Sequence, residues 1–185
     1  VFRPRCENCN ECKSLRIPVT AYKPNRSQAR NFKANHGRIN LEIQEPALTD
    51  EIMDLYDRFH AERSFSRDWP IKEDRDEFSF DSSFLDNPFP VEQWMYRENG
   101  KLCGVGYVDA LKCGLSAIYF FHDPNFYSHG IGIWNVMTLI NEAKRRGLPH
   151  VYMGYYVKGC QSLEYKAGFK PNEVLSLAGK WVPYS

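Results

Sequence analysis

The sequence predicts a mixed α/β protein, in which a central β-sheet carries helices on its faces. Three features lead to this prediction: short apolar strands recur along the chain, two longer segments have helical periodicity, and 43% of the 185 residues are apolar. No apolar run approaches the roughly 18 residues that a membrane span needs. No signal peptide is visible, and six cysteines are too few for the dense framework of a small secreted protein. We therefore expect reduced thiols, a cytoplasmic location and no membrane partner.

The first half of the chain contains one predicted strand and one long helix. Apolar and polar residues alternate from residue 39 to residue 43, which predicts a strand that Pro46 ends. Residues 49–65 place apolar side chains on one helical face, with acidic residues in the first turn. Residues 64–92 mix aromatic, acidic and proline residues, so we expect a loop with short helical pieces there.

The second half adds a hairpin, further strands and two helices. Residues 93–111 predict the hairpin, because two apolar runs flank Asn99-Gly100, a strong signal for a two-residue turn. Residues 130–147 predict a helix with a basic last turn that stops at Gly147. The remaining predicted elements are a strand at 115–122, a strand at 150–157, a short helix at 160–169 and two strands at 173–177 and 180–184.

Charge is distributed unevenly along the chain. Residues 1–40 hold nine Lys or Arg against two Asp or Glu, whereas residues 41–103 hold seven against sixteen. A basic segment on a chain of net charge +1 suggests a polyanion or an acidic ligand at one face, although the two segments could also pair with each other. We predict a basic, cysteine-containing N-terminal lobe over residues 1–37 and a main domain over residues 38–185.

The predicted order of elements resembles the acyltransferase fold of the GNAT N-acetyltransferases. Enzymes of that fold hold the pyrophosphate of coenzyme A on a glycine-rich loop before the central helix, and residues 127–132 match this loop in part. Gly130 and Gly132 fit the pattern, whereas Tyr127 stands where Gln or Arg is usual. The resemblance implies a GNAT-like fold, and the departure at Tyr127 argues against coenzyme A.

Four motifs give a closer resemblance. They are Tyr-Lys-Pro-Asn-Arg-Ser-Gln at 22–28, Phe-His-Asp-Pro at 121–124, Met-Gly-Tyr-Tyr at 153–156 and Tyr-Lys-Ala-Gly-Phe-Lys-Pro at 165–171. In this order they resemble the arginyl-tRNA–protein transferase family over nearly the whole chain, and most closely its short bacterial branch. Members usually carry about forty further residues before the position of Val1, so we expect the N-terminal lobe to be truncated at its start.

The resemblance implies an aminoacyltransferase whose partners are Leu-tRNA and proteins that begin with Asp or Glu. Leucine would move to the α-amine of the protein and create a degradation signal of the N-end rule pathway. The choice of leucine rests on the bacterial-type cysteine spacing at residues 6–12. An aminoacyl ester is already activated, so the chemistry requires no cofactor. The alternatives are a coenzyme A-dependent N-acetyltransferase of the same fold and a non-catalytic reader of acidic protein N-termini.

Candidate catalytic residues lie at strand ends near the predicted sheet centre. Asp109 could hold the incoming ammonium and help to remove its proton, unless it is an ordinary turn aspartate. Three tyrosines could donate to an oxyanion or stack on the terminal adenine, or they could be plain core residues: Tyr119, Tyr155 and Tyr156. Lys166 could bind a phosphate or protonate the leaving oxygen, or it could be a solvated lysine.

Two sets of polar and basic residues are assigned to the two substrates. Ser27 is the predicted N-cap of a short helix, and with it a basic edge would bind tRNA phosphates: Lys23, Arg26, Arg30 and Lys33. This edge could instead be an ordinary solvated face. Cations around the N-terminal cysteines would bind the acidic side chain of the acceptor: Arg3, Arg5, Lys13 and Arg16.

Cys6, Cys9 and Cys12 follow one another at a spacing of three. They could hold zinc or an iron–sulfur cluster if a fourth ligand is near, and the family's larger members suggest a further N-terminal cysteine for that place. Otherwise they are free thiols in a packed lobe. The other cysteines are expected to be buried, small apolar residues: Cys103, Cys113 and Cys160.

Overall fold

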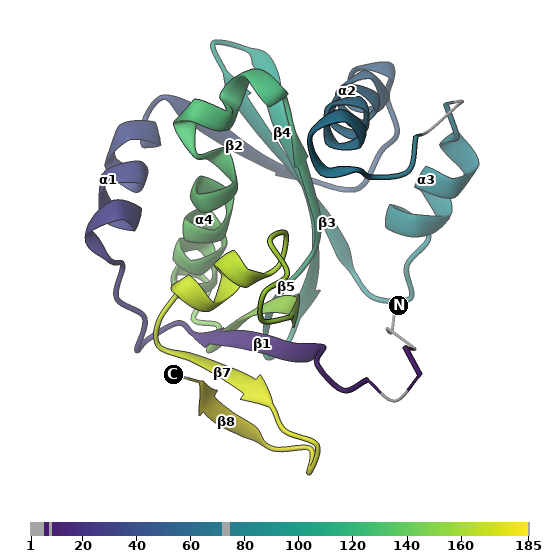
Figure 1. Cartoon of the computed structure of the whole chain (residues 1–185). Coiled ribbons are helices and arrows are strands. Elements are labelled where there is room, and N and C mark those ends of the chain that lie inside the picture. Colours follow the sequence, from purple (N-terminus) through teal and green to yellow (C-terminus); the bar gives the residue numbers. More distant parts are fainter. Residues whose placement is uncertain (1–5, 8, 72–74, 185) are drawn as a thin grey trace.

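The structure is a computed structural model that describes residues 6–7, 9–71 and 75–184. Within these residues the centre is one sheet of eight strands in the order β2-β3-β4-β5-β6-β1-β7-β8 (Figure 1). The strands are β1 Lys13–Pro18, β2 Ile39–Gln44, β3 Val91–Glu98, β4 Lys101–Leu111, β5 Gly114–His122, β6 His150–Tyr156, β7 Asn172–Leu175 and β8 Trp181–Tyr184. The helices are α1 Arg26–Asn35, α2 Asp50–Arg67, α3 Glu77–Phe84, α4 Ile131–Arg145 and the short 3-10 helices η1 Pro124–His129 and η2 Glu164–Gly168.

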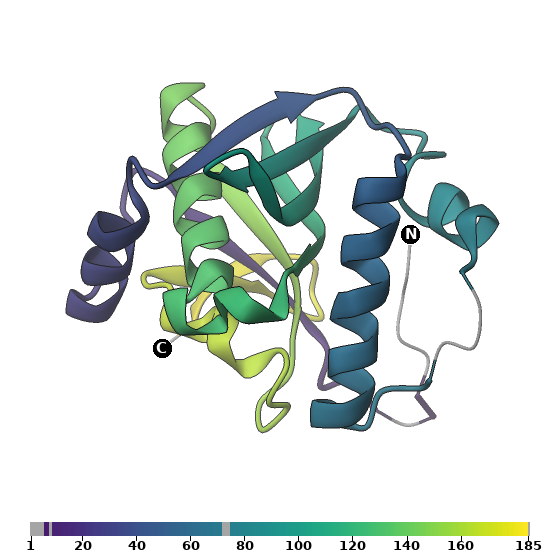
Figure 2. The ribbon, with the colours of Figure 1, turned by 90° about the horizontal axis from the view of Figure 1, so that it is seen from above.

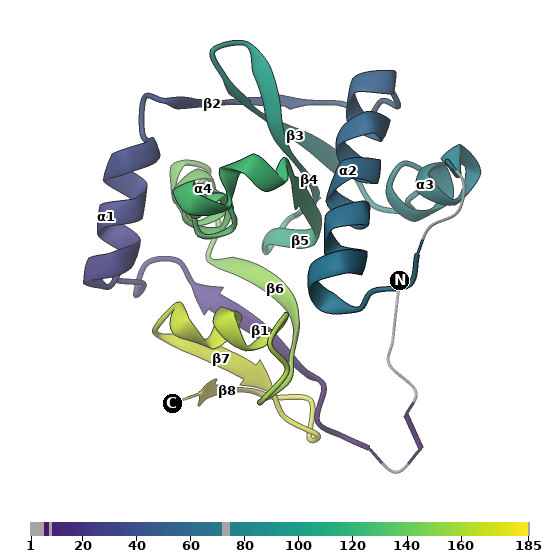
Figure 3. The same ribbon diagram turned by 45° about the horizontal axis from the view of Figure 1, so that its top comes forward.

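Helices cover both faces of this sheet (Figure 3). One face carries α4, with α1 packed against α4, over a core that includes Leu15, Ile17, Trp134, Leu139 and Val151. The other face carries α2 and α3 over β3, β4 and β5, with a core that includes Ile52, Leu55, Phe80, Tyr107 and Phe121. The predicted fold class, a mixed sheet flanked by helices, is therefore confirmed. No helix in the described part of the chain is long and apolar enough to cross a membrane.

The hairpin and the long helices follow the sequence signals. Asn99 and Gly100 join β3 to β4 with φ angles of 50° and 81°, both in the left-handed region that a two-residue hairpin turn requires. The Thr49 side chain accepts a hydrogen bond from the amide of Ile52 and caps α2. α3 is a short helical piece within the segment that was expected to be mostly loop.

Two elements near the N-terminus differ from the prediction. Residues 13–18 form β1, an inner strand that pairs antiparallel with both β6 and β7, although no strand was predicted there. Asn25, not Ser27, is the N-cap of α1, so the predicted cap is wrong. The Asn25 side chain accepts from the amide of Gln28, and the Gln28 side chain accepts from the amide of Asn25, which forms a capping box. These described parts of the predicted lobe, residues 1–37, are thus built into the main sheet and its helix layer.

Gln28 also joins two of the sequence motifs. Its buried side chain accepts a hydrogen bond from the Tyr22 hydroxyl at 2.9 Å and donates to the carbonyl oxygen of Gly168 at 3.0 Å. The motif at 22–28 is therefore bound to the motif at 165–171, and α1 is held against η2. We call this contact the Gln28 brace.

Loss of the Gln28 brace is expected to destabilise the fold. We expect Gln28→Ala to lower the free energy of unfolding by about 2–3 kcal/mol, because several buried groups lose their partners at once. Tyr22→Phe removes one hydrogen bond to the brace, so it should cost about 1 kcal/mol. Urea denaturation followed by circular dichroism measures both, with the exposed Ser27→Ala as control. A Gln28→Ala variant as stable as Ser27→Ala would contradict the brace.

The cysteine predictions are confirmed only in part. Cys103 is fully buried in β4, as expected. Cys113 is exposed and Cys160 is partly exposed, so the prediction that both are buried is wrong. The reason is their place in the fold: Cys113 lies in the turn between β4 and β5, and Cys160 lies in the turn after β6.

Candidate active site at the opening between β5 and β6

β5 and β6 are parallel neighbours that pair over only part of their length. The paired residues are 114–116 on β5 and 150–152 on β6, although β5 continues to His122 and β6 to Tyr156. Beyond the paired residues the strands separate toward their C-terminal ends. Substrates of open α/β sheets commonly bind outside the carboxyl ends of such strands. This opening in the sheet is therefore the candidate active site.

A β-bulge shapes the β6 side of the opening. Ser14 of β1 faces Tyr155 and Arg16 faces Tyr152, so β6 carries one residue more than β1 over this stretch. Gly154 lies within the stretch and has a φ of 70°, which a residue with a Cβ adopts only with strain. Bulges redirect side chains and are frequent beside active sites. The motif at 153–156 therefore supplies a local irregularity at the place where the sheet opens.

Lys166 lies over this bulge. Its Nζ donates a hydrogen bond to the carbonyl oxygen of Tyr155 at 2.8 Å, and a Cβ added to Gly154 would lie 3.8 Å from Nζ. Burial lowers the pKa of Lys166 to about 8. Its side chain can therefore hold or release a proton near neutral pH, as a general acid requires.

Tyr119 lies on β5, beyond the last residue that pairs with β6. Its hydroxyl is 3.1 Å from Nε2 of His60 on α2, and its ring stacks on Phe84 at 5.1 Å. Burial raises the pKa of Tyr119, so the hydroxyl keeps its proton and remains a hydrogen-bond donor. The His60 ring packs against Tyr56 at 4.2 Å and Trp69 at 5.6 Å, which fixes its position.

The other predicted catalytic residues occupy different places. Tyr155 lies at the bulge, and its backbone carbonyl holds Lys166. Tyr156 is buried in the core on the α4 side and its hydroxyl accepts a hydrogen bond from Tyr184 at 3.1 Å. Asp109 faces Ser116 across the β4–β5 ladder, level with the closed end of the opening, and Asn87 donates to it at 3.3 Å. The structure thus brings Tyr155 and Lys166 together, with Tyr119 on the neighbouring strand and Asp109 apart from them.

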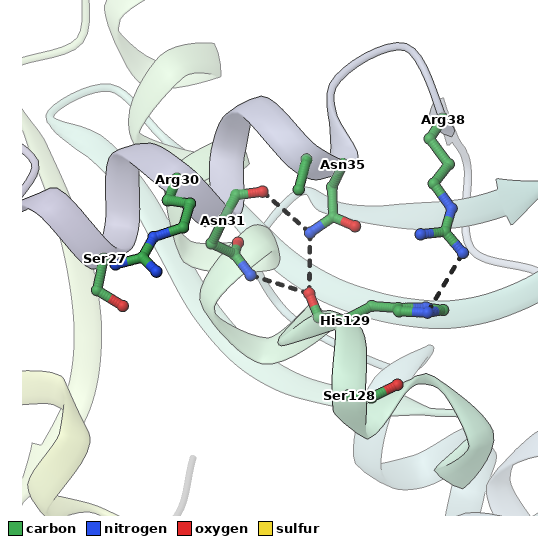
Figure 4. A pocket seen from close by; sticks show the side chains of 8 residues that line it. Ser27, Arg30, Asn31, Asn35, Arg38, Ser128 and His129 are labelled. Carbon is green, nitrogen blue, oxygen red and sulfur yellow. Dashed lines mark hydrogen bonds between the residues drawn. The ribbon is translucent and has the colours of Figure 1, made fainter.

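A second polar site lies between α1 and η1. A pocket of about 320 Å³ is lined by Ser27, Arg30, Asn31, Ala34, Asn35, Arg38, Ser128 and His129 (Figure 4). Asn31 and Asn35 both donate to the carbonyl oxygen of His129 at 2.9 Å, so they tie α1 to the segment before α4. Gly130 permits this approach, because a Cβ there would lie 2.5 Å from the Asn31 amide nitrogen.

The cations predicted to bind tRNA are arranged along this helix. Lys23, Arg26, Arg30 and Lys33 are all exposed, as is Ser27. Arg30 lines the pocket and has no ion pair among the described residues. Arg38, which the sequence analysis did not select, lines the same pocket; it pairs with Glu98 and lies 3.3 Å from Nε2 of His129.

Residues 51–176 match the family model described as "Arginine-tRNA-protein transferase, C terminus". The chain belongs to the arginyl-tRNA–protein transferase family. It is therefore an aminoacyltransferase. Curated aspartate/glutamate leucyltransferases from Pseudomonas fluorescens (strain Pf0-1) and Pseudomonas entomophila (strain L48) are 37% and 36% identical to it, each over 98% of this chain and 75% of the relative.

Two solved structures resemble the fold of this family member. The C-terminal domain of a putative lysylphosphatidylglycerol synthetase from Agrobacterium fabrum has a TM-score of 0.64 and 13% identity, and the match covers 93% of this chain and 58% of that one. L-PGS from Bacillus licheniformis has a TM-score of 0.55 and 8% identity, over 83% of this chain and 48% of that one. At these identities the likeness concerns the fold alone.

Of the four cations predicted to bind the acceptor in this transferase, two contact side chains of the same chain and two lie outside the described residues. The Arg16 guanidinium pairs with Glu173 at 2.7 Å and lies over the Trp181 ring at 4.4 Å. Lys13 lies 6.0 Å from the Tyr184 ring. Arg3 and Arg5 lie outside the described residues. Arg16 is therefore held by side chains of its own chain and is not poised to bind an acceptor.

The N-terminal cysteines of this transferase do not form a metal site in the described structure. Cys6 and Cys9 are exposed and Cys12 is partly exposed. Burial, followed by the neighbouring thiols of Cys9, Cys6 and Cys160, raises the pKa of Cys12. Among the described residues no three His, Cys, Asp or Glu side chains are placed to hold a metal ion.

His60 contacts Tyr119 beside the opening but was not among the predicted site residues. His60 lies one helical turn after Tyr56, on the side of α2 whose apolar residues pack on the sheet. A histidine on an apolar helical face was the available signal, but its partner Tyr119 is 59 residues away in the sequence. Sequence spacing therefore gave no indication of the pair.

Proposed function

We propose that this transferase moves leucine from Leu-tRNA to the N-terminal α-amine of proteins that begin with Asp or Glu. The product would carry an N-end rule degradation signal, and the reaction would take place in the cytoplasm. The observation that carries the proposal is the contact between two family motifs at the opening. Lys166, of the motif at 165–171, donates a hydrogen bond to the Tyr155 carbonyl oxygen of the motif at 153–156 and lies over the bulge at Gly154. The similarity to curated aspartate/glutamate leucyltransferases supports the choice of leucine and of acidic acceptors.

The reaction has two steps: the acceptor α-amine attacks the leucyl ester, and the 3′-oxygen of the tRNA then leaves. The acceptor amine, with an unperturbed pKa near 8, gives one proton to water, and the neutral amine attacks the carbonyl carbon of the leucyl ester; the nitrogen gives a second proton to water once the new bond has formed. A carbon–nitrogen bond forms, and the tetrahedral intermediate carries an oxyanion that needs hydrogen-bond donors. The bond from carbon to the 3′-oxygen of the tRNA then breaks, and that oxygen takes a proton. We assign the donor to the oxyanion to Tyr119 and the proton donor to Lys166.

A transfer assay tests this function. Wild-type protein is incubated with radiolabelled Leu-tRNA and peptides that begin with Asp, Glu, Lys or Ala. We expect label on the Asp and Glu peptides alone. Peptide binding without transfer would instead identify a reader of acidic N-termini, and acetylation from acetyl-CoA would identify an acetyltransferase. Either result would refute the proposal.

The proposed tRNA site is the basic side of α1 together with the pocket that Arg30 lines. Phosphate contacts hold a tRNA in place without reading its sequence, and each one releases counterions. We therefore expect Arg30→Ala to weaken Leu-tRNA binding and to reduce the slope of log K against log salt concentration by about 1. Filter binding at several salt concentrations measures the slope.

Lys112→Ala is the matched control for Arg30→Ala. Lys112 is exposed in the turn between β4 and β5. Its substitution by alanine also removes one positive charge, but outside the α1 pocket. We expect it to leave the slope unchanged. Equal slopes for Arg30→Ala and wild type would show that Arg30 makes no phosphate contact.

The zinc or iron–sulfur site at Cys6, Cys9 and Cys12 stays a proposal. Its donor set is suitable, since thiolates bind both groups. The turn that ends at Cys160 follows β6, which pairs with β1 directly after Cys12, so a fourth thiol is available nearby. Metal analysis of the purified protein decides whether these thiols hold a metal.

A further inference from the structure

A largely buried guanidinium lies beside the opening. Arg63 on α2 has one-fifth of its side chain exposed and is held between two rings, at 5.0 Å from Phe59 and 5.1 Å from Tyr127. Its Nε has no hydrogen-bond partner in the described structure. The carboxylate of Glu62 is within ion-pair reach, but its oxygen is 3.9 Å from Nε, beyond hydrogen-bond distance.

This arrangement is costly without an external partner. An arginine stays charged at all relevant pH values and offers five N–H donors. Removing a cation from water is unfavourable unless it is paired, and two aromatic faces return only part of that cost. The Glu62 carboxylate lies too far from Nε, at 3.9 Å, to supply the missing hydrogen bond, and it accepts one from the Tyr127 hydroxyl at 2.6 Å. No hydrogen bond from the Arg63 guanidinium to the described residues is present, and although Nε itself is buried, the exposed fifth of the side chain is open to an anion from outside the chain.

Arg63 is also close to the residues assigned to the reaction. It lies one helical turn after His60, which contacts the Tyr119 hydroxyl on β5 at 3.1 Å. Figure 2 shows the C-terminal end of α2, which carries Arg63, beside η1, and the two elements are in contact. Arg63 therefore lies on the same helix as His60, whose ring contacts the Tyr119 hydroxyl, and beside η1.

We propose that Arg63 binds the side-chain carboxylate of the acceptor's first residue and so determines the preference for Asp and Glu. This inference rests on the proposed function. A planar guanidinium matches a carboxylate through two parallel hydrogen bonds. The rings of Phe59 and Tyr127 hold the guanidinium in place, and one-fifth of the side chain is exposed for an anion to reach.

A tRNA phosphate is the competing ligand for this cation. The basic residues assigned to tRNA lie on α1, which packs against α4 on one face of the sheet, whereas Arg63 lies on α2 on the opposite face. The short helix η1 contacts both, because its Tyr127 packs on Arg63 and its Ser128 and His129 line the α1 pocket. Arg63 stands apart from the basic row on α1, which favours the acceptor carboxylate, and the KM for each substrate distinguishes the two ligands.

Steady-state transfer assays with varied peptide and varied Leu-tRNA test this assignment. We expect Arg63→Gln to raise the KM for an Asp peptide by about 30-fold, since a hydrogen bond to a charged group contributes about 1.5–3 kcal/mol. The KM for Leu-tRNA should not change. Wild type should prefer the Asp peptide over the matched Asn peptide, and Arg63→Gln should lose most of that preference. Arg67→Gln, one turn along α2 and exposed, removes the same charge and should behave as wild type.

Two controls separate a loss of folding or of transfer activity from a loss of carboxylate binding at Arg63. Arg63→Lys retains the charge, so it should fold even if Arg63→Gln does not, and it should recover only part of the affinity because it lacks the planar fork. Binding of fluorescent Asp and Asn peptides without tRNA tests the role of Arg63 independently of transfer. An absence of leucine transfer would refute the proposed function but not the binding of the acceptor carboxylate by Arg63. A raised KM for Leu-tRNA with an unchanged KM for peptide would assign Arg63 to a phosphate. Equal Asp preference in wild type and Arg63→Gln would also overturn the proposal.

Discussion

Lys166→Met is expected to slow leucyl transfer by about 10²- to 10⁴-fold, the range that a positioned general acid contributes. The Lys166 ammonium is held by the Tyr155 carbonyl at 2.8 Å, over the bulge at Gly154. In the proposed reaction it gives its proton to the departing 3′-oxygen of the tRNA. Methionine keeps the length and apolar character of the chain but has no proton to give. Removing a buried charge should not destabilise the fold.

The pH dependence separates this role from simple charge stabilisation. Burial lowers the pKa of Lys166 to about 8 from its usual value of 10.5, so the ammonium form is present below pH 8 and is lost above it. We therefore expect the wild-type rate to rise toward pH 8 as the acceptor amine loses its proton and to fall above pH 8 as Lys166 loses its own, and Lys166→Met to lack the decrease above pH 8. Rates measured from pH 6 to 10 at saturating peptide test the expectation.

Lys166→Arg is the matched control for the proton-transfer role. Arginine keeps the positive charge, but its pKa above 12 prevents it from releasing a proton. We expect Lys166→Arg to remain slow, with a KM for Leu-tRNA close to that of wild type. Full activity in Lys166→Arg would show that the residue acts only through its charge, as a phosphate-binding lysine would.

The parts of the fold that the sequence predicted are those specified by local signals. The turn at Asn99-Gly100 and the helix of residues 130–147 depend on turn chemistry and on 3.6-residue periodicity, which neighbouring residues alone determine. β1 has such a pattern too, with Leu15 and Ile17 buried, but its place between β6 and β7 depends on strands more than 130 residues away. The order of strands in a sheet is not a local property.

The site was harder to predict for the same reason. Arg16 stands in a basic segment, and its partner Glu173 is 157 residues distant in the chain, so neighbouring residues gave no indication of that contact. Arg63 stands in an acidic segment, where a single cation would be expected to pair with its neighbours. Phe59 lies one turn before Arg63 on the same helix, but the second ring, Tyr127, comes from η1 and reaches Arg63 only through the packing of α2 on η1. Net charge along the sequence therefore directed the acceptor prediction to the basic N-terminal segment and away from Arg63.

Tyr119→Phe is expected to lower kcat by about 10²- to 10³-fold, the usual effect of removing one donor from an oxyanion site. A hydroxyl has a single proton, so Tyr119 can donate to the oxyanion only if it accepts from Nε2–H of His60, at 3.1 Å. Phenylalanine preserves the stacking on Phe84 at 5.1 Å, so the fold should keep nearly all of its stability. Rapid-quench measurement of a single turnover gives the rate of the chemical step.

The Michaelis constants distinguish an oxyanion donor from a core residue. A hydrogen bond made only in the transition state lowers kcat and kcat/KM together, so the KM for both substrates should stay near wild type in Tyr119→Phe. His60→Gln supplies an amide N–H near the position of Nε2, so it should lose less activity than His60→Leu, which leaves the hydroxyl free to turn away. If the two His60 variants were equally active and Tyr119→Phe kept its full kcat, Tyr119 and His60 would be packing residues between α2 and β5, and the oxyanion would need another donor.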